Sequence, residues 1–167
     1  MSVNAYIPHL LVLPEDEANR VIANGFVNHV NVVMRAVQVL PRASGWSDVV
    51  EKFKAHHLKK MREFPERRIL LLIDFDENPE ARLIYIENEI PEDVKSRVCV
   101  LGIHSEPEKL RSATGKKFEA IGATLANECA EDRRDLWVHE LLKHNEPELV
   151  RLSQDVSPFL FHGVESR

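Results

Sequence analysis

Apolar residues gather in four short runs that are separated by longer amphipathic stretches. The runs are rich in β-branched and aliphatic side chains, which is typical of strands. They lie at residues 6–13, 30–40, 68–75 and 97–103. The run at 68–75 is apolar throughout its middle, which indicates a strand covered on both faces. The pattern therefore predicts a sheet that contains at least one strand buried between two layers.

The stretches between and after these runs place apolar residues at helical spacing. Helices are predicted at residues 15–29, 48–63, 79–89, 115–130, 132–144 and 146–152. Ser47 and Asn145 stand directly before two of these helices, and both are residue types that favour the N-cap position. We therefore expect Ser47 to begin the second helix and Asn145 to begin the last one.

Strands and helices alternate as far as the fourth strand, and from about residue 106 the pattern is mainly helical. This order predicts an α/β fold of three layers, with a mostly parallel central sheet, helices on both of its faces and a helical C-terminal part. Neither a repeat nor a convincing linker interrupts the chain, so residues 1–167 are interpreted as a single domain. Right-handed crossovers place the carboxyl ends of the strands along one edge, where such sheets bind ligands.

Acidic side chains follow three of the four predicted strands. They are Glu15, Asp16 and Glu17 after the first strand, Asp74 and Asp76 at the end of the third, and Glu106 and Glu108 after the fourth. Like charges in a partly buried cleft repel each other, and a hard divalent cation such as Mg²⁺ or Mn²⁺ removes that penalty. Asp74 and Asp76 would both face one ion if the extended conformation persists to Asp76. The spacing therefore predicts a metal site at this edge of the sheet.

The same residues have a second interpretation, because carboxylates at a helix start cap the helix and favour its dipole. Residues 15–17 would do this for the first helix, and Glu106 and Glu108 for a helix after the fourth strand. The aspartate pair differs, because Asp74 ends a very apolar strand and Asp76 does not stand against an obvious helix start. Capping is thus favoured for the other clusters, and a site is favoured for the pair.

A glutamate after the first strand, an Asp-x-Asp pair after a later one and a parallel βα frame together resemble the Toprim fold. That fold is the catalytic domain shared by topoisomerases, bacterial primases and several nucleases. The resemblance covers roughly residues 5–110, and the chain looks most like small stand-alone Toprim-like proteins. It implies acid/base chemistry for Glu15 and Mg²⁺ binding by Asp74 and Asp76, with Glu106 as a further ligand. The implied activity is Mg²⁺-dependent phosphodiester cleavage, in which the metal activates water and stabilises charge on the phosphate.

Two other interpretations stay open. Toprim glutamates are commonly followed by glycine, whereas Asp16 follows Glu15 here. Together with the formal net charge of -5, this favours an inactive interaction module that retains the fold. The segment "DFDEN" also resembles the Asp-x-Asp nucleophile loop of haloacid-dehalogenase-like phosphatases. That loop normally follows the first strand of the core, whereas here it follows the third.

The net charge of -5 gives no general attraction to nucleic acid, so a DNA or RNA partner would need a local basic patch. Residues 51–68 form the one clear basic segment, and Lys59 and Lys60 within it are candidates for contacts with the phosphate backbone. Lys116 and Lys117 form a second, looser group after the fourth strand. The alternative for the basic segment is the solvated face of an amphipathic helix.

Two cysteines do not make a disulfide framework, and the N-terminus lacks the layout of a secretion signal, so the cytoplasm is the expected location. No apolar run approaches the ~20 residues that a membrane helix needs, so no membrane contact is expected. The apolar segment at residues 157–163 is expected either to dock on the core or to join a second subunit. A homodimer or another protein partner therefore stays an open interpretation.

Overall fold

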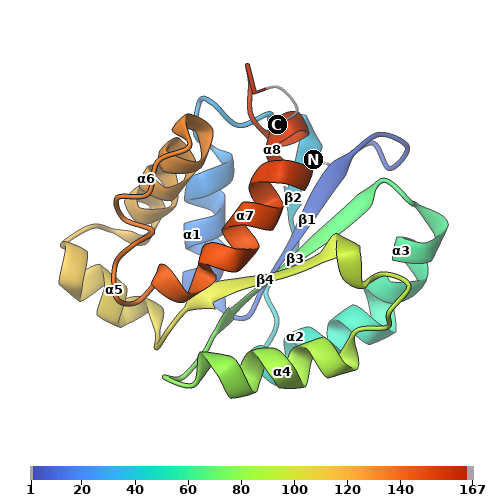
Figure 1. Ribbon diagram of the computed structural model, residues 1–167, viewed down its shortest axis with the longest axis horizontal. Helices are drawn as coiled ribbons and strands as arrows, with labels where there is room; N and C mark the ends of the chain where they lie inside the picture. The colour runs from blue at the N-terminus through green and yellow to red at the C-terminus, as the bar shows by residue number, and fades with distance from the viewer. Residues whose placement is uncertain (1, 165–167) are drawn as a thin grey trace.

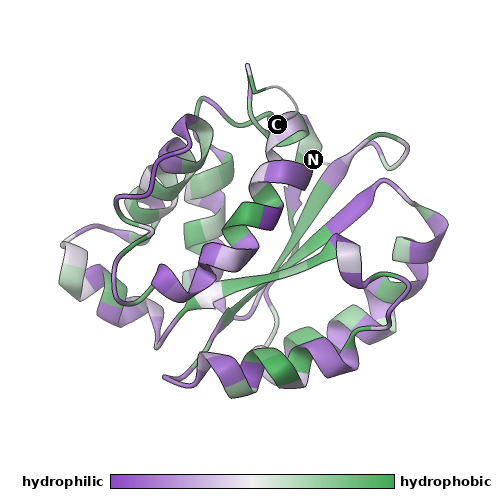
Figure 2. Ribbon diagram, viewed as in Figure 1, coloured by the Kyte–Doolittle hydropathy of each residue, from purple (hydrophilic) through white to green (hydrophobic). Residues whose placement is uncertain are grey.

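The centre of the computed structural model, which describes residues 2–164, is a four-stranded sheet in which every strand pair is parallel (Figure 1). Its strands, in the spatial order β2-β1-β3-β4, are β2 (Val37–Val39), β1 (His9–Pro14), β3 (Arg67–Asp74) and β4 (Val98–Ile103). Apolar residues dominate the middle of the sheet strands, as Figure 2 shows. The predicted parallel α/β fold is confirmed.

Helices cover both faces of this sheet and give three layers. One face carries α2 (Trp46–Lys52), α3 (Leu58–Glu63) and α4 (Pro79–Glu89). The other carries α1 (Glu17–Val27), α6 (Phe118–Glu131), α7 (Glu146–Asp155) and α8 (Ser157–Leu160), while α5 (Pro107–Thr114) follows β4. Alternate residues of β1 serve the two layers, because Leu11 and Leu13 pack toward α2, whereas Leu10 and Val12 pack toward α1 and α6.

The predicted second strand is much shorter than residues 30–40. Only Val37–Val39 pair with the sheet, and Met34–Ala36 form a 3₁₀ turn before them. Val32 instead pairs in antiparallel fashion with Phe161, and the Val33 N–H donates to the Leu160 carbonyl at 2.7 Å. The β-branched residues that look like a sheet strand therefore hold the C-terminal segment against the core.

The helix predicted at residues 48–63 is present over its whole length, and a π-helical turn at Phe53–His57 joins α2 to α3. Ser47 is not its N-cap, because the helix begins earlier, at Trp46, after Gly45. Gly45 has φ of 107°, a conformation that favours glycine. The Asp48 carboxylate accepts a hydrogen bond from the Ser44 N–H at 2.8 Å and closes the first turn.

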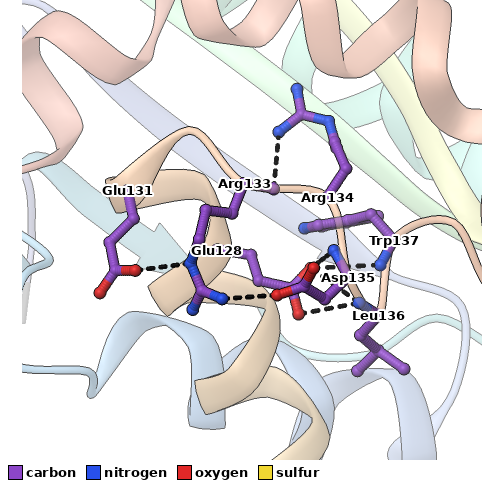
Figure 3. A network of polar contacts seen from close by, with 7 residues as sticks. All are labelled: Glu128, Glu131, Arg133, Arg134, Asp135, Leu136 and Trp137. Atoms are coloured by element: carbon purple, nitrogen blue, oxygen red, sulfur yellow. Dashed lines mark hydrogen bonds and ion pairs between the residues drawn. The ribbon is translucent and has the colours of Figure 1, made fainter.

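The helix predicted at 132–144 is wrong, and Figure 3 shows why. The buried carboxyl group of Glu128, which is 2% exposed, accepts hydrogen bonds from three consecutive backbone N–H groups, those of Asp135, Leu136 and Trp137. These donors would bond to carbonyls four residues earlier in a helix. Asp132, with φ of 56°, ends α6 in the left-handed region. The chain therefore leaves α6 as an anchored loop.

The outer edge of β4 is bonded to side chains of α7 and of the residue before it. The Asn145 amide both accepts from the Gly102 N–H, at 3.1 Å, and donates to the Gly102 carbonyl, at 2.8 Å. Glu148 accepts from the Val100 N–H at 2.9 Å. Asn145 stands before α7 as predicted, but its side chain makes no capping hydrogen bond, because it is committed to β4.

The apolar C-terminal segment docks on the core of its own chain, which is one of the two predicted outcomes. Leu160 and Phe161 are buried, and the Phe161 ring packs against Phe26 with centroids 5.9 Å apart. Cys99 and Cys129 are free thiols. Within residues 2–164, no helix combines the length and the apolarity required to cross a lipid bilayer.

Candidate metal centre

Glu15 leaves the sheet at the carboxyl end of β1. Its N–H donates to the Leu72 carbonyl at 2.9 Å, which extends the β1–β3 pairing by one residue. Its side chain turns back to the neighbouring strand, where Oε2 accepts a hydrogen bond from the Asp74 N–H at 2.5 Å. Glu15 is 9% exposed. The carboxyl group is thus fixed by the strand ends themselves and not by a mobile loop.

Asp16 is the N-cap of α1. Its Oδ1 accepts from the Asn19 backbone N–H at 2.9 Å, which confirms the capping interpretation for this residue. The same oxygen also accepts from the Asn19 side-chain Nδ2 at 3.0 Å. Capping of α1 therefore orients Asp16 beside Glu15 and leaves its second oxygen available.

Asp74 is the last residue of β3 and is 6% exposed. Asn19 Nδ2 donates to its Oδ1 at 2.9 Å, so one amide group bridges Asp16 and Asp74. Glu15, Asp16 and Asp74 each offer an oxygen such that all three atoms lie within 4.8 Å of one another. Two adjacent strands thus bring three acidic side chains to one point at the carboxyl edge of the sheet.

Burial makes this concentration of negative charge unfavourable. Desolvation raises the pKa of Asp74 to about 8, against the hydrogen bond from Asn19, and the nearby Glu15 carboxylate raises it further. Desolvation likewise raises the pKa of Glu15 to about 7, against the hydrogen bond from the Asp74 N–H. When these buried carboxyl groups are ionised, a nearby positive charge is therefore needed to offset their desolvation and mutual repulsion.

Asn19 is the most buried polar residue of the group, with an exposed fraction of 0%. Its Nδ2 serves two carboxylates, but its Oδ1 is buried and has no hydrogen-bond partner within residues 2–164. An unpaired buried acceptor costs about 1–3 kcal/mol. Asn19 thus keeps a buried oxygen acceptor beside the acidic group that residues 2–164 do not satisfy.

Asp76 is not part of this group, although the sequence places it two residues after Asp74. The extended conformation ends at Asp74, and Asp76 and Glu77 have φ of 47° and 66°. The Asp76 carboxylate instead pairs with Arg82 Nη1 at 2.7 Å. Asp16 therefore stands where the sequence analysis expected Asp76.

Arg82 supplies the nearest positive charge to the strand end. Its Nη1 also donates to the Asp74 backbone carbonyl at 2.7 Å, and its guanidinium carbon lies 4.3 Å from the centroid of the Trp46 ring. Its side chain is only 15% exposed. The sequence analysis did not identify Arg82 or Trp46 as residues of the site. The two side chains come together only because α2 and α4 lie side by side in the folded protein.

The remaining predicted residues lie outside the acidic group. Glu106 is exposed at the N-cap position of α5, where its side chain makes no capping hydrogen bond. Lys59 and Lys60 are exposed on α3, which leads into the amino end of β3 and hence lies at the opposite edge of the sheet. Lys116 and Lys117 are exposed in the connection between α5 and α6.

Sequence reasoning missed Asn19 as a member of the site and favoured capping over metal binding for Asp16. The sequence did contain a signal for Asn19, because the side chain three residues after an N-cap residue lies close to that N-cap residue. Comparison of the chain with protein-family models, with curated proteins and with solved structures finds no match. The assignment of function therefore rests on the geometry of this site.

Proposed function

We propose that Asp16 and Asp74 bind a divalent cation, Mg²⁺ or Mn²⁺, next to Glu15, and that the protein hydrolyses phosphodiester bonds in nucleic acid there. One observation carries the proposal: one oxygen from each of three carboxyl groups lies within 4.8 Å of the others, beside the buried amide of Asn19, whose oxygen has no partner within residues 2–164. An acidic cluster alone is common on protein surfaces. A buried acidic cluster with an unsatisfied oxygen acceptor is the environment that a hard cation relieves.

Asp16 and Asp74 are the best placed ligands. Each uses Oδ1 to accept from the Asn19 amide, so the second oxygen of each is left for the ion. Mg²⁺ commonly takes one or two carboxylates and completes its shell with water and phosphate oxygens. The two aspartates supply such a partial shell.

Glu15 is suited to proton transfer. One of its oxygens is held by the Asp74 N–H, which fixes the orientation of the carboxyl group. Its pKa of about 7 lies near neutral pH, where a general base or acid works best. A bound cation would supply charge neutralisation on the phosphate and a more acidic water. Glu15 would then accept the proton of the attacking water or return it to the leaving oxygen.

Cation binding is tested by thermal unfolding in rising Mg²⁺ or Mn²⁺. A ligand that binds only the folded state stabilises it by about 2.7 kcal/mol at 100 times its Kd. We expect a saturable rise in Tm for the wild type, and no such rise for Asp74→Asn. The matched control is Asp93→Asn, which makes the same change at an exposed residue paired with Arg62.

Two results would remove the metal site: a wild-type Tm that does not respond to the cations, or an equal rise in Asp74→Asn. Hydrolysis is then measured on single-stranded and duplex DNA and RNA with each cation. Glu15→Gln should retain the Tm response better than Asp74→Asn and lose most of the cleavage. Cleavage that persists undiminished in Glu15→Gln would exclude its role in proton transfer.

A further inference from the structure

A shallow pocket of about 210 Å³ lies where α2 meets α4. It is lined by Trp46, Asn78, Ala81, Arg82 and Tyr85. The rings of Trp46 and Tyr85 meet edge to face, with centroids 5.3 Å apart and planes at 85°. The Arg82 guanidinium lies over the Trp46 ring. Its lining thus combines two aromatic rings, a planar cation and an amide side chain in a space smaller than the ~300–1,000 Å³ of pockets for drug-sized ligands.

This pocket adjoins the acidic group through two separate contacts. From α4, Arg82 Nη1 donates to the Asp74 carbonyl at 2.7 Å. From the start of α2, the Gly45 N–H donates to the Glu15 carbonyl at 3.2 Å, and Trp46 is the next residue. A phosphate at the acidic group would therefore lie beside the pocket, as the phosphate of a nucleotide lies beside its base.

The exposed parts of the lining match the chemistry of a nucleobase. Tyr85 is a large aromatic residue, yet it is 50% exposed on α4. Asn78 is exposed and uses only its Oδ1, which accepts from the Ala81 N–H at 3.4 Å, so its Nδ2 can donate to a ligand. Aromatic rings and guanidinium planes stack on bases, and that stacking tolerates any sequence. A base that is paired inside a duplex cannot offer its faces in this way.

We propose that the pocket formed by Trp46, Asn78, Arg82 and Tyr85 receives an unstacked base of a single-stranded nucleic acid. The base belongs to a nucleotide next to the phosphate held at Glu15, Asp16 and Asp74. The inference rests on the proposed function and narrows its substrate to single strands. It also gives Arg82 a role, because its interaction with Asp74 and Asp76 holds its guanidinium plane between the acidic group and the base.

The test compares binding of a fluorescent oligothymidylate with binding of an abasic oligonucleotide of equal length and of the corresponding duplex. Ca²⁺ replaces Mg²⁺, and a gel confirms that the strands stay intact. Tyr85→Ala should raise the Kd for oligothymidylate about 5- to 150-fold, the range expected for loss of stacking on one base. The same substitution should leave the Kd for the abasic strand unchanged. Ile84→Ala, an exposed residue of α4 outside the pocket lining, is the matched control and should bind oligothymidylate as the wild type does.

Tryptophan fluorescence gives a second readout that does not depend on cleavage. The chain has two tryptophans, and Trp137→Phe leaves Trp46 as the only one. Oligothymidylate should change the emission of this variant in a saturable way, whereas the abasic strand should not. A Tyr85→Ala variant that binds oligothymidylate as tightly as the wild type would overturn the proposal. A Tyr85→Ala substitution that raises the Kd for the single strand and the Kd for the duplex equally would overturn it as well.

The two proposals fail in distinguishable ways. If cation binding and cleavage are normal while Tyr85→Ala has no effect on oligothymidylate binding, the base pocket falls and the metal-dependent activity stands. If the Tm does not respond to cations while Tyr85→Ala still weakens oligothymidylate binding, the pocket stands and the proposed hydrolysis falls. Tyr85→Ala should itself retain the wild-type response of the Tm to Mg²⁺, because Tyr85 contributes no oxygen to the acidic group.

Discussion

At the scale of single residues, Asn19 organises the site although it carries no charge. Its amide gives both carboxylates a donor, while its own oxygen is buried without a hydrogen-bond partner within residues 2–164. The sequence analysis correctly placed Glu15 and Asp74 at the carboxyl edge of a parallel sheet. It could not place Asp76, because the extended strand ends at Asp74 and the backbone turns left-handed at Asp76 and Glu77. Side chains two residues apart face alike only while the backbone stays extended.

The raised pKa of Asp74 predicts a stability that depends on pH. An acid whose folded-state pKa exceeds its unfolded value destabilises the fold progressively as pH rises from the lower value to the higher one. Without cations, stability should therefore fall between about pH 4 and pH 8. Asp74→Asn stays neutral and can still accept from Asn19, so it should be more stable than the wild type at pH 8, by roughly 1–3 kcal/mol.

Urea unfolding in the presence of a chelator at pH 4 and pH 8 measures this effect. The advantage of Asp74→Asn should shrink at pH 4, where the wild-type side chain is protonated in the folded state. Asp93→Asn serves as the control. An Asp74→Asn variant that is less stable than the wild type at both pH values would contradict the inferred cost of the buried charge.

At the scale of elements, hydrophobic spacing identified helices well where they pack on the sheet and poorly where a polar group competes. The residues after α6 have helical spacing, but Glu128 binds the N–H groups that a helix would need (Figure 3). The stretch at 30–40 has β-branched residues, yet part of it pairs with Phe161 from the far end of the chain. Both errors arise from partners that are distant or buried, which local periodicity does not reveal.

Glu128 is thus predicted to anchor the loop that follows α6. Glu128→Ala would leave three backbone donors without their acceptor and should destabilise the fold by about 3 kcal/mol. Hydrogen exchange should accelerate most at Asp135, Leu136 and Trp137. Glu131→Ala, on the same helix, removes only a surface ion pair with Arg133 and should cost less than about 1 kcal/mol. Equal effects of the two substitutions would show that the loop does not depend on Glu128.

At the scale of the whole molecule, the order of strands and helices along the chain was enough to predict the parallel sheet and its two helical layers. Parallel neighbours require crossovers, and because every strand pair is parallel, the carboxyl ends of the strands lie at one edge. The acidic group at that edge follows from this topology, since Glu15 and Asp74 close adjacent strands. The pocket does not follow from it, because the contact between α2 and α4 depends on where each helix begins.

The concentration of protonated acids at this edge predicts that cation binding releases protons. Burial raises the pKa of Glu15 to about 7 and that of Asp74 to about 8, so both carry protons over much of the neutral range. A cation binds the ionised forms, and its apparent affinity should therefore increase as pH rises from 6 to 8. Calorimetric titration with Mg²⁺ in two buffers of different ionisation enthalpy measures the protons released. An affinity that is constant over this range would contradict cation binding at this acidic group.

The bonds from Asn145 and Glu148 to β4 have a consequence for self-association. An open sheet edge is a template on which another polypeptide can add a strand, and proteins block such edges to avoid fibrils. Here the N–H groups of Val100 and Gly102 are already occupied by side chains that imitate a fifth strand without continuing the ladder. A second copy of this chain could not extend the sheet past β4, so any dimer on that side would have to be built from helices.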